Sequence, residues 1–376
     1  MSAPIHYDVV SCSECGFTFA SNIPNQASLN YAYQNAENHI HQKLAPGLAQ
    51  IHQDFYHFVT SNIKLSLKTE VLDIGSGMGH FLYHFKKAGF QRLTGVEPSA
   101  TATKLAQQVY GLNIQNHTID TFRSNSSYDL ITLCGVLEHI ADLQNAARHL
   151  NELLSPEGHI FIAVPDASRF GNCLPKEPFL EFALEHINFF SRVSLGNLMR
   201  LAGFEEVISA SHHNDFYDNY YILGLYRKAP LQADTPSAFI VDKKTAASVH
   251  TYAHKSTQQH AVVATIMARL ADDEAPLLVW GAGSLTSRLM CDTRLAEAKI
   301  IAIIDRNQAL QGKHIMGIPI VEEDFLTQHP GTTVLVASTT YALEIVKLLK
   351  EQYQWTGQIV TLIGVAEIEG TNESAP

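Results

Sequence analysis

A glycine-rich turn after a short apolar run holds the residues best suited to chemistry. Residues 71–79 read Val-Leu-Asp-Ile-Gly-Ser-Gly-Met-Gly. Glycine carries no side chain and readily adopts positive φ, so such a turn lets the main chain approach a flat, polar ligand. No Lys-Ser or Lys-Thr pair follows the glycines, so the turn is not a P-loop for phosphates. We predict a site for a nucleoside-like ligand here.

Later polar residues complete this predicted site. Glu97 ends the next apolar run, and its carboxylate could accept hydrogen bonds from both hydroxyls of a ribose. Asp120 could accept a hydrogen bond from an adenine amino group, and segment 135–139 follows a further apolar run. The residues expected to bind the ligand are Asp73, Gly75, Ser76, Gly77, Gly79, Glu97, Pro98, Asp120, Thr121, Gly135, Val136, Glu138 and His139.

A neighbouring acid and imidazole, Glu185 and His186, are the catalytic candidates. An imidazole can act as a general base near neutral pH, and a nearby carboxylate raises its basicity. The alternative is that His186 only caps or packs its segment. Segment 212–215, His-His-Asn-Asp, is a second polar candidate of lower rank.

These residues are placed by alternating strand and helix patterns. Strands are predicted over 70–74, 92–96, 128–134 and 159–164, with helices over 80–88, 100–110 and 143–154. This order predicts a mainly parallel sheet with helices on both faces. Ligands of such sheets bind outside the carboxyl ends of the strands, which is where the candidate residues fall.

A second strand, glycine turn and helix begins at Pro276. The turn Gly281-Ala-Gly283 is followed by a strand ending at Asp305, as in dinucleotide-binding units, but Thr286 replaces the third glycine. Taken alone, this unit suggests a nicotinamide-dependent oxidoreductase. The predicted fold class is α/β, with a Rossmann-like domain over 68–228, a linker over 229–242, and a second, smaller Rossmann-like domain over 243–368. A disordered tail is expected over 369–376.

The segment 1–67 precedes these domains. Cys12 and Cys15 form one Cys-x-x-Cys knuckle, which supplies two of the four ligands of a structural zinc site. We favour a remnant turn without metal over a site completed by His6 or a distant histidine. The rest is predicted to be a helical lid, in which Tyr31 and Tyr33 either close over a ligand or only pack.

Composition excludes several function classes. The formal net charge of −11 argues against a surface for nucleic acid or an anionic membrane. The sequence shows neither a signal-peptide pattern nor an apolar run long enough to span a membrane, and five cysteines do not form a disulfide framework. We therefore expect a soluble, cytoplasmic protein.

Four motifs in order resemble class I S-adenosylmethionine-dependent methyltransferases over about 70–203. They are the glycine turn, Gly-Val-Glu-Pro-Ser from Gly95, Tyr-Asp-Leu-Ile-Thr-Leu from Tyr128 with Val-Leu-Glu-His-Ile from Val136, and Leu-Ser-Pro-Glu-Gly from Leu154. The second domain, with Val-Trp-Gly-Ala-Gly-Ser from Val279 and Ile-Asp-Arg-Asn from Ile304, resembles the C-terminal domain of sugar C-methyltransferases.

This resemblance implies S-adenosylmethionine as cofactor and a small-molecule acceptor, a nucleotide-linked sugar methylated at carbon beside a carbonyl. It also implies that His186, paired with Glu185, is the base. The chain departs from that family in keeping one cysteine pair and in having Ala183 and Leu184 where a tyrosine and a histidine are usual. An O- or N-methyltransferase of another small metabolite, or a non-catalytic module binding S-adenosylmethionine or a nucleotide, are the alternatives.

Overall fold

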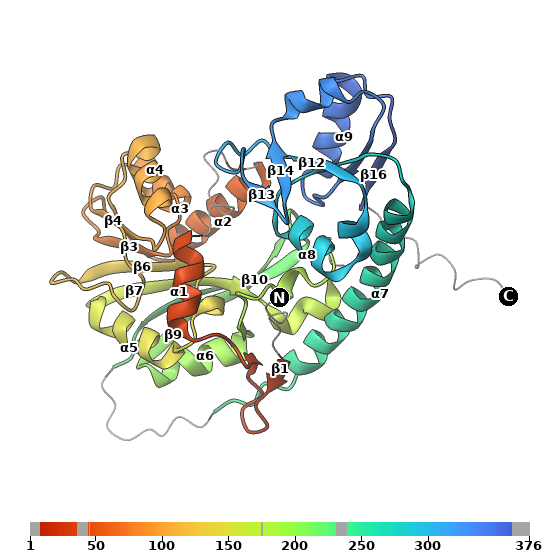
Figure 1. The fold of residues 1–376 in the computed structure, drawn as a ribbon. Helices are drawn as coiled ribbons and strands as arrows, with labels where there is room; N and C mark the ends of the chain where they lie inside the picture. Colours follow the sequence, from red (N-terminus) through yellow and green to blue (C-terminus); the bar gives the residue numbers. More distant parts are fainter. Residues whose placement is uncertain (1–7, 36–43, 45, 174–175, 231–238, 363–376) are drawn as a thin grey trace. The chain divides into compact units, whose positions relative to one another are not determined.

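The computed structural model describes residues 8–35, 44, 46–173, 176–230 and 239–362 (Figure 1). The chain divides into two compact units. The first comprises the described residues up to Cys173 together with Glu181–Thr251, and the second comprises the described part of Leu174–Leu180 together with the described residues from Tyr252 onward. His6 and the predicted tail, 369–376, lie outside the described residues.

A seven-stranded sheet forms the centre of the first unit. Its order is β5 (Ile114–Gln115), β4 (Leu93–Val96), β3 (Val71–Ile74), β6 (Tyr128–Cys134), β7 (Leu154–Pro165), β10 (Asn219–Lys228) and β9 (Phe204–Asn214). The strands from β5 to β7 are parallel, and β10 is antiparallel to both β7 and β9. Because Tyr221 pairs with Pro165, the β9–β10 turn lies at the same edge as the carboxyl ends of the parallel strands.

Helices cover both faces of this sheet (Figure 1). They are α2 (Pro46–Asn62), α3 (His80–Lys87), α4 (Ala100–Tyr110), α5 (Leu143–Leu153) and α6 (Arg192–Leu201). Alternate strand residues point to opposite faces: Val71 packs in the apolar cluster with α2 and α3, whereas Leu72 packs in the cluster with α5 and α6. This two-sided burial explains the continuous apolar runs in the sequence.

A small antiparallel sheet joins the N-terminal region to this unit. It contains β1 (Asp8–Ser11), β2 (Thr18–Ser21) and β8 (Asn188–Phe189), and is followed by α1 (Gln26–Asn35). The β1–β2 turn carries Cys12 and Cys15 as free thiols. Gly16 in this turn has φ 76°, and a Cβ there would lie 1.9 Å from the carbonyl oxygen of Asp242. The turn therefore packs against the chain just before α7 (Thr245–Asp272).

The second unit is also a mainly parallel α/β fold, as predicted. Its sheet has the order β13 (His314–Ile315), β14 (Ile318–Val321), β12 (Ile300–Ile304), β11 (Leu277–Trp280), β15 (Thr333–Val336) and β16 (Ile359–Thr361), with α8 (Ser284–Asp292) and α9 (Ala342–Glu351). Among the described strand pairs of this sheet, only β13–β14 is antiparallel. The first strand, β11, lies at the centre, as in Rossmann-like sheets.

Short 3₁₀ helices occupy several connections. They are η1 (Leu137–His139), η2 (Ala167–Asn172), η3 (Leu180–Phe182), η4 (Arg294–Glu297) and η5 (Glu323–Gln328). In the described part of the chain, no helix has the length and apolar character needed to cross a membrane.

Helix α2 brings a histidine against α3 in an apolar setting. The ring of His52 lies 6.3 Å from the ring of His80 and 6.2 Å from that of Phe81. Its Nδ1 atom is buried and has no hydrogen-bond partner among the described residues. Burial, followed by the neighbouring charges of His80 and His84, lowers the pKa of His52 to about 3. His52 therefore stays neutral in the folded protein at pH values where an exposed histidine becomes protonated.

The burial of neutral His52 predicts that the free energy of unfolding decreases as the pH is lowered. Below an unfolded-state pKa of about 6.5 the unfolded chain binds a proton that folded His52 does not, which costs up to about 1.4 kcal/mol per pH unit. When the pH is lowered from 7.5 to 5.5, the free energy of unfolding of the wild type should fall partly because of His52. In His52→Phe, which keeps the aromatic packing, we expect this fall to be smaller by about 1 kcal/mol. Urea unfolding at both pH values measures this difference, and equal losses in the two proteins would contradict it.

Candidate active site

The glycine turn between β3 and α3 leaves an open approach at its middle glycine. Gly75, Gly77 and Gly79 have φ values of 68°, 52° and 78°. A Cβ would lie 2.5 Å from a methyl carbon of Val136 at Gly75, and 2.5 Å from one of Leu112 at Gly79. At Gly77 a Cβ would meet nothing within 4 Å. The outer glycines are therefore needed for packing, whereas the middle one borders open space.

Glu97, at the carboxyl end of β4, holds this turn. Its Oε2 accepts a hydrogen bond from the Gly77 N–H (2.9 Å) and its Oε1 accepts one from the Ser99 N–H (2.8 Å). Burial raises the pKa of the Glu97 carboxyl, and these two N–H donors oppose that shift. Asn116 donates to the main-chain carbonyls of Glu97 and Pro98. Each carboxylate oxygen has a further lone pair for a ligand hydroxyl.

Asp73 and Ser76 are directed into the sheet rather than toward solvent. Asp73 is 2% exposed and accepts a hydrogen bond from the Thr132 hydroxyl at 2.6 Å. Burial raises the pKa of Asp73 to about 7, the Thr132 hydrogen bond lowers it, and the charge of Glu97 raises it further. The Ser76 hydroxyl donates to the carbonyl of Val96. Both residues fix the base of the turn.

Asp120 offers a buried acceptor atom. Its Oδ2 is shielded from solvent and lacks a hydrogen-bond partner in the described part of the chain. Thr121 is occupied locally, because its hydroxyl accepts a hydrogen bond from the Thr118 N–H. Asp120 lines a cavity of ≈ 310 Å³, whose other residues are Ile119, Arg123, Asn145, Ala146, Arg148, His149 and Glu152.

Gly135 and Val136 shape the end of β6. Gly135 has φ 69° and donates its N–H to the carbonyl of Ala163 on β7. Val136 is 8% exposed and supplies the methyl group that contacts Gly75. These residues set the wall opposite the glycine turn.

The chain after Val136 brings the side chains of Glu138 and His139 close to that of His186. One oxygen or nitrogen atom of each side chain lies within 4.8 Å of those of the other two. Burial raises the pKa of Glu138 to about 7, and its Oε2 has no hydrogen-bond partner among the residues described. The Nδ1 of His139 lies 2.7 Å from the Tyr33 hydroxyl and 2.8 Å from the Glu185 carbonyl oxygen. The sequence predicts Glu138 and His139 as ligand-binding residues, and the structure brings both next to His186.

A second carboxylate lies beside His186. The Oε2 of Glu181, a residue 5% exposed, is 3.9 Å from the His186 Nδ1, and its Oε1 accepts a hydrogen bond from Asn219 at 2.9 Å. Burial raises the pKa of Tyr221 on β10 well above its usual range, and the charge of Glu181 adds to this shift. Glu185 contributes its main-chain carbonyl to this cluster through the contact with His139.

Several of these residues were not predicted from the sequence. Thr132 could have been noticed as the polar residue inside an otherwise apolar strand. Glu181 lies in a short 3₁₀ helix and Asn219 is the first residue of β10, so their sequence context gave no comparable indication. Of the two tyrosines considered for the lid, Tyr31 is 70% exposed, whereas Tyr33 contacts His139.

Comparison with known families decides what this site belongs to. A family model described as a methyltransferase domain matches residues 27–210. Residues 27–210 form a methyltransferase domain. With its Rossmann-like sheet it is a class I S-adenosylmethionine-dependent methyltransferase domain, and the chain is an enzyme. A second model, described as C2185-like, N-terminal, matches residues 274–356. No curated protein matches the chain significantly.

Solved methyltransferases are among the similar structures. The 1,6-didemethyltoxoflavin-N1-methyltransferase of Burkholderia thailandensis is 16% identical with a TM-score of 0.41, over 60% of this chain and 100% of its own. N-methyltransferase NodS of Bradyrhizobium japonicum WM9, with S-adenosylhomocysteine, is 17% identical with a TM-score of 0.42, over 54% and 98%. A methyltransferase of Mesorhizobium loti is 14% identical with a TM-score of 0.40, over 46% and 97%.

The residues at the carboxyl ends of β3 and β4 fit S-adenosylmethionine. The open space at Gly77 admits a ligand next to the main chain, and the Glu97 carboxylate beside it can accept hydrogen bonds from ribose hydroxyls. The unpartnered Oδ2 of Asp120 can accept a hydrogen bond from an amino group such as that of adenine. These three residues are our candidates for holding the cofactor.

The corresponding turn of the second unit is held by an acid in a similar way. Asp305 accepts hydrogen bonds from the N–H groups of Ala282 and Asn307, both at 2.7 Å. Thr286, at the position of the missing third glycine, is fully buried and donates its hydroxyl to the Gly281 carbonyl. A substituted third position thus stabilises the turn itself.

Cofactor binding can be tested at Gly77 with a matched control. Gly331 in the second unit also has positive φ (78°), and a Cβ there would likewise meet open space, so Gly331→Arg introduces similar backbone strain elsewhere. We expect Gly77→Arg to weaken S-adenosylhomocysteine binding at least about tenfold, and Gly331→Arg to leave it unchanged. Glu97→Ala should weaken it about 10–100-fold through lost hydrogen bonds to a charged group. Isothermal titration calorimetry measures all three, and wild-type affinity in both site variants would contradict the assignment.

Proposed function

We propose that the enzyme methylates a small polar acceptor, a nucleotide-linked sugar, at a carbon beside a carbonyl group. The observation that carries this proposal is the cluster of buried Glu138 with the half-buried His139 and His186, beyond the end of β6. Methylation at carbon requires removal of a proton from that carbon, and a partly buried imidazole among carboxylates is suited to accept it.

S-adenosylmethionine, when bound, supplies an electrophilic methyl group, so the chain mainly has to align the acceptor and move a proton. In this proposal His186 accepts the proton from the acceptor carbon, and the electron pair of the broken C–H bond forms the enolate of the adjoining carbonyl, which is the nucleophile that an electrophilic methyl group would require. Glu185, its predicted partner, fixes the adjoining ring of His139 through its carbonyl. Tyr33 covers the cluster through its hydrogen bond with His139, and its burial limits the access of water.

The polarity of the cluster supports an acceptor rich in hydroxyl groups. Three buried atoms at this edge have no hydrogen-bond partner among the described residues: Oε2 of Glu138, Nδ2 of Asn214 and Oδ1 of Asn219. They comprise one donor group and two acceptors, so the surroundings of the half-buried His139 and His186 are polar and suit a polar acceptor. The cytoplasmic location expected from the sequence stays a prediction.

Methyl transfer to oxygen or nitrogen is the alternative, and the experiment described below distinguishes it from methyl transfer to carbon. Such acceptors need less assistance from a base, because their nucleophilic atom already carries a lone pair. Strong dependence on His186 together with solvent exchange of a carbon-bound hydrogen would favour C-methylation.

The experiment uses the full chain, S-adenosylmethionine and a panel of nucleotide-linked keto-sugars. We expect His186→Ala to lower kcat about 10²–10⁴-fold and to abolish exchange of the acceptor's α-hydrogen in D₂O. The exposed residue His57 on α2 provides the control, and His57→Ala should retain wild-type turnover. Mass spectrometry of the product gives turnover, and NMR gives hydrogen exchange. Full turnover in His186→Ala, or no transfer to any keto-sugar by the wild type, would count against the proposal.

A further inference from the structure

In the segment before β8, two oxygen atoms of one residue, Glu181, lie near the same ring nitrogen of His186. The Nδ1 of His186 lies 3.3 Å from the main-chain oxygen of Glu181 and 3.9 Å from its Oε2. When Nδ1–H donates toward this residue, the lone pair of the neutral ring is on Nε2. The short helix η3, which contains Glu181, therefore selects the nitrogen that can accept a proton.

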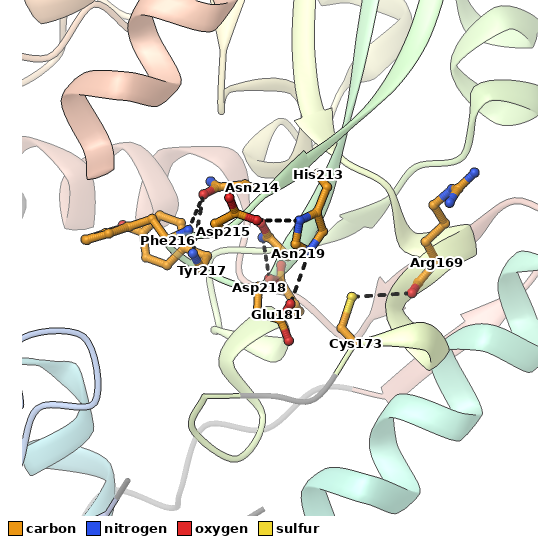
Figure 2. A network of polar contacts seen from close by, with 10 residues as sticks. All are labelled: Arg169, Cys173, Glu181, His213, Asn214, Asp215, Phe216, Tyr217, Asp218 and Asn219. Atoms are coloured by element: carbon orange, nitrogen blue, oxygen red, sulfur yellow. Dashed lines mark hydrogen bonds and ion pairs between the residues drawn. The ribbon is translucent and has the colours of Figure 1, made fainter. Parts of the chain in front are cut away.

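The Glu181 carboxylate is itself held from a third element. Asn219, the first residue of β10, donates its Nδ2 to the Oε1 of Glu181 (Figure 2). Asn219 pairs with Asn214, the last residue of β9, across the hairpin. Both asparagines are at least nine-tenths buried, so Asn219 contacts Glu181 in an environment of low solvent access. The contact joins residues far apart in the sequence.

The hairpin turn is built in a way that fixes Asn219. Asn214 accepts hydrogen bonds from the N–H groups of Phe216 and Tyr217, which closes the turn (Figure 2). Both ring nitrogens of His213 contact carboxylates, Nδ1 that of Asp215 at 2.9 Å and Nε2 that of Asp218 at 3.1 Å. The polar segment 212–215, a candidate site in the sequence, therefore stabilises the hairpin turn that precedes Asn219.

We propose that Glu181, held by Asn219, is the positioning carboxylate of His186, orienting its ring and fixing the proton of the neutral ring on Nδ1. This rests on the proposed function, in which His186 is the base. The sequence favours Glu185 because it is adjacent, but the structure shows the Glu185 main-chain carbonyl at His139 and the Glu181 carboxylate at His186. Glu185 lies in a turn that is closed by the hydrogen bond from the His186 N–H to the Ala183 carbonyl, and Glu181 lies on the short helix just before that turn.

The other titratable groups of the cluster act on His186 as well. Glu138 and His139 face it from η1, and Glu138 carries a charge interaction with it. Tyr33 on α1 contacts His139, while Tyr221 on β10 interacts with Glu138 and Glu181. A test must therefore change Glu181 alone and follow His186 directly.

Two-dimensional NMR of the full chain with ¹⁵N-labelled histidine gives the tautomer of His186 without any acceptor. In the wild type we expect neutral His186 to carry its proton on Nδ1, which faces two oxygen atoms of Glu181. Glu181→Gln should convert part of the neutral ring to the tautomer with its proton on Nε2, because one of these oxygens loses its charge. Asn219→Ala should change the tautomer in the same direction, and the double variant should change it no further than Glu181→Gln.

Glu177 provides the matched control, since it is another buried glutamate of the same connecting segment and pairs with Arg288. Glu177→Gln should leave the tautomer of His186 unchanged. With a keto-sugar acceptor, Glu181→Gln should lower kcat about tenfold with little change in KM, while Glu181→Asp recovers part of the loss. An unchanged tautomer of His186 in Glu181→Gln would overturn the positioning role. A changed tautomer without methyl transfer in the wild type would overturn only the proposed function.

Discussion

The first unit depends on the bridge between the Glu97 carboxylate and the main-chain N–H of Gly77. This contact fixes the turn after β3 to the end of β4, so the two strands present one continuous polar edge. Its geometry requires the glycines: side chains at Gly75 or Gly79 would collide with Val136 or Leu112. Burying a carboxylate is costly unless it is hydrogen bonded, and the two N–H donors supply the necessary partners.

The second unit repeats this bridge between Asp305 and Ala282. An acid after the second strand is therefore a structural requirement of a glycine turn in both units, and it does not by itself identify a cofactor. What distinguishes the first unit is the edge beyond β6, where Glu138 and His139 meet His186. In the proposed function, the chemistry is thus specified by residues outside the glycine motif.

The sequence predicted the fold well because its information is local. Apolar runs such as the one ending at Ile74 are buried on both faces, and their alternation with helices fixes a parallel sheet. The cofactor candidates follow strand ends, so topology alone brings them together. The contacts of His186 could not be predicted in this way. They depend on a 3₁₀ helix carrying Glu181 and on the register of the hairpin carrying Asn219, and neither has a periodic sequence pattern.

The polar edge carries a cost in free energy. A buried polar atom without a partner costs about 1–3 kcal/mol, and Glu138, Asn214 and Asn219 each retain one such atom among the described residues. The other polar atoms of the two asparagines are held from two elements. Asn214 accepts hydrogen bonds from the N–H groups of Phe216 and Tyr217 in the hairpin, whereas Asn219 donates to Glu181 on η3. These contacts keep both side chains in place despite the cost, so in the proposed function the polar edge beside His186 is organised before an acceptor binds.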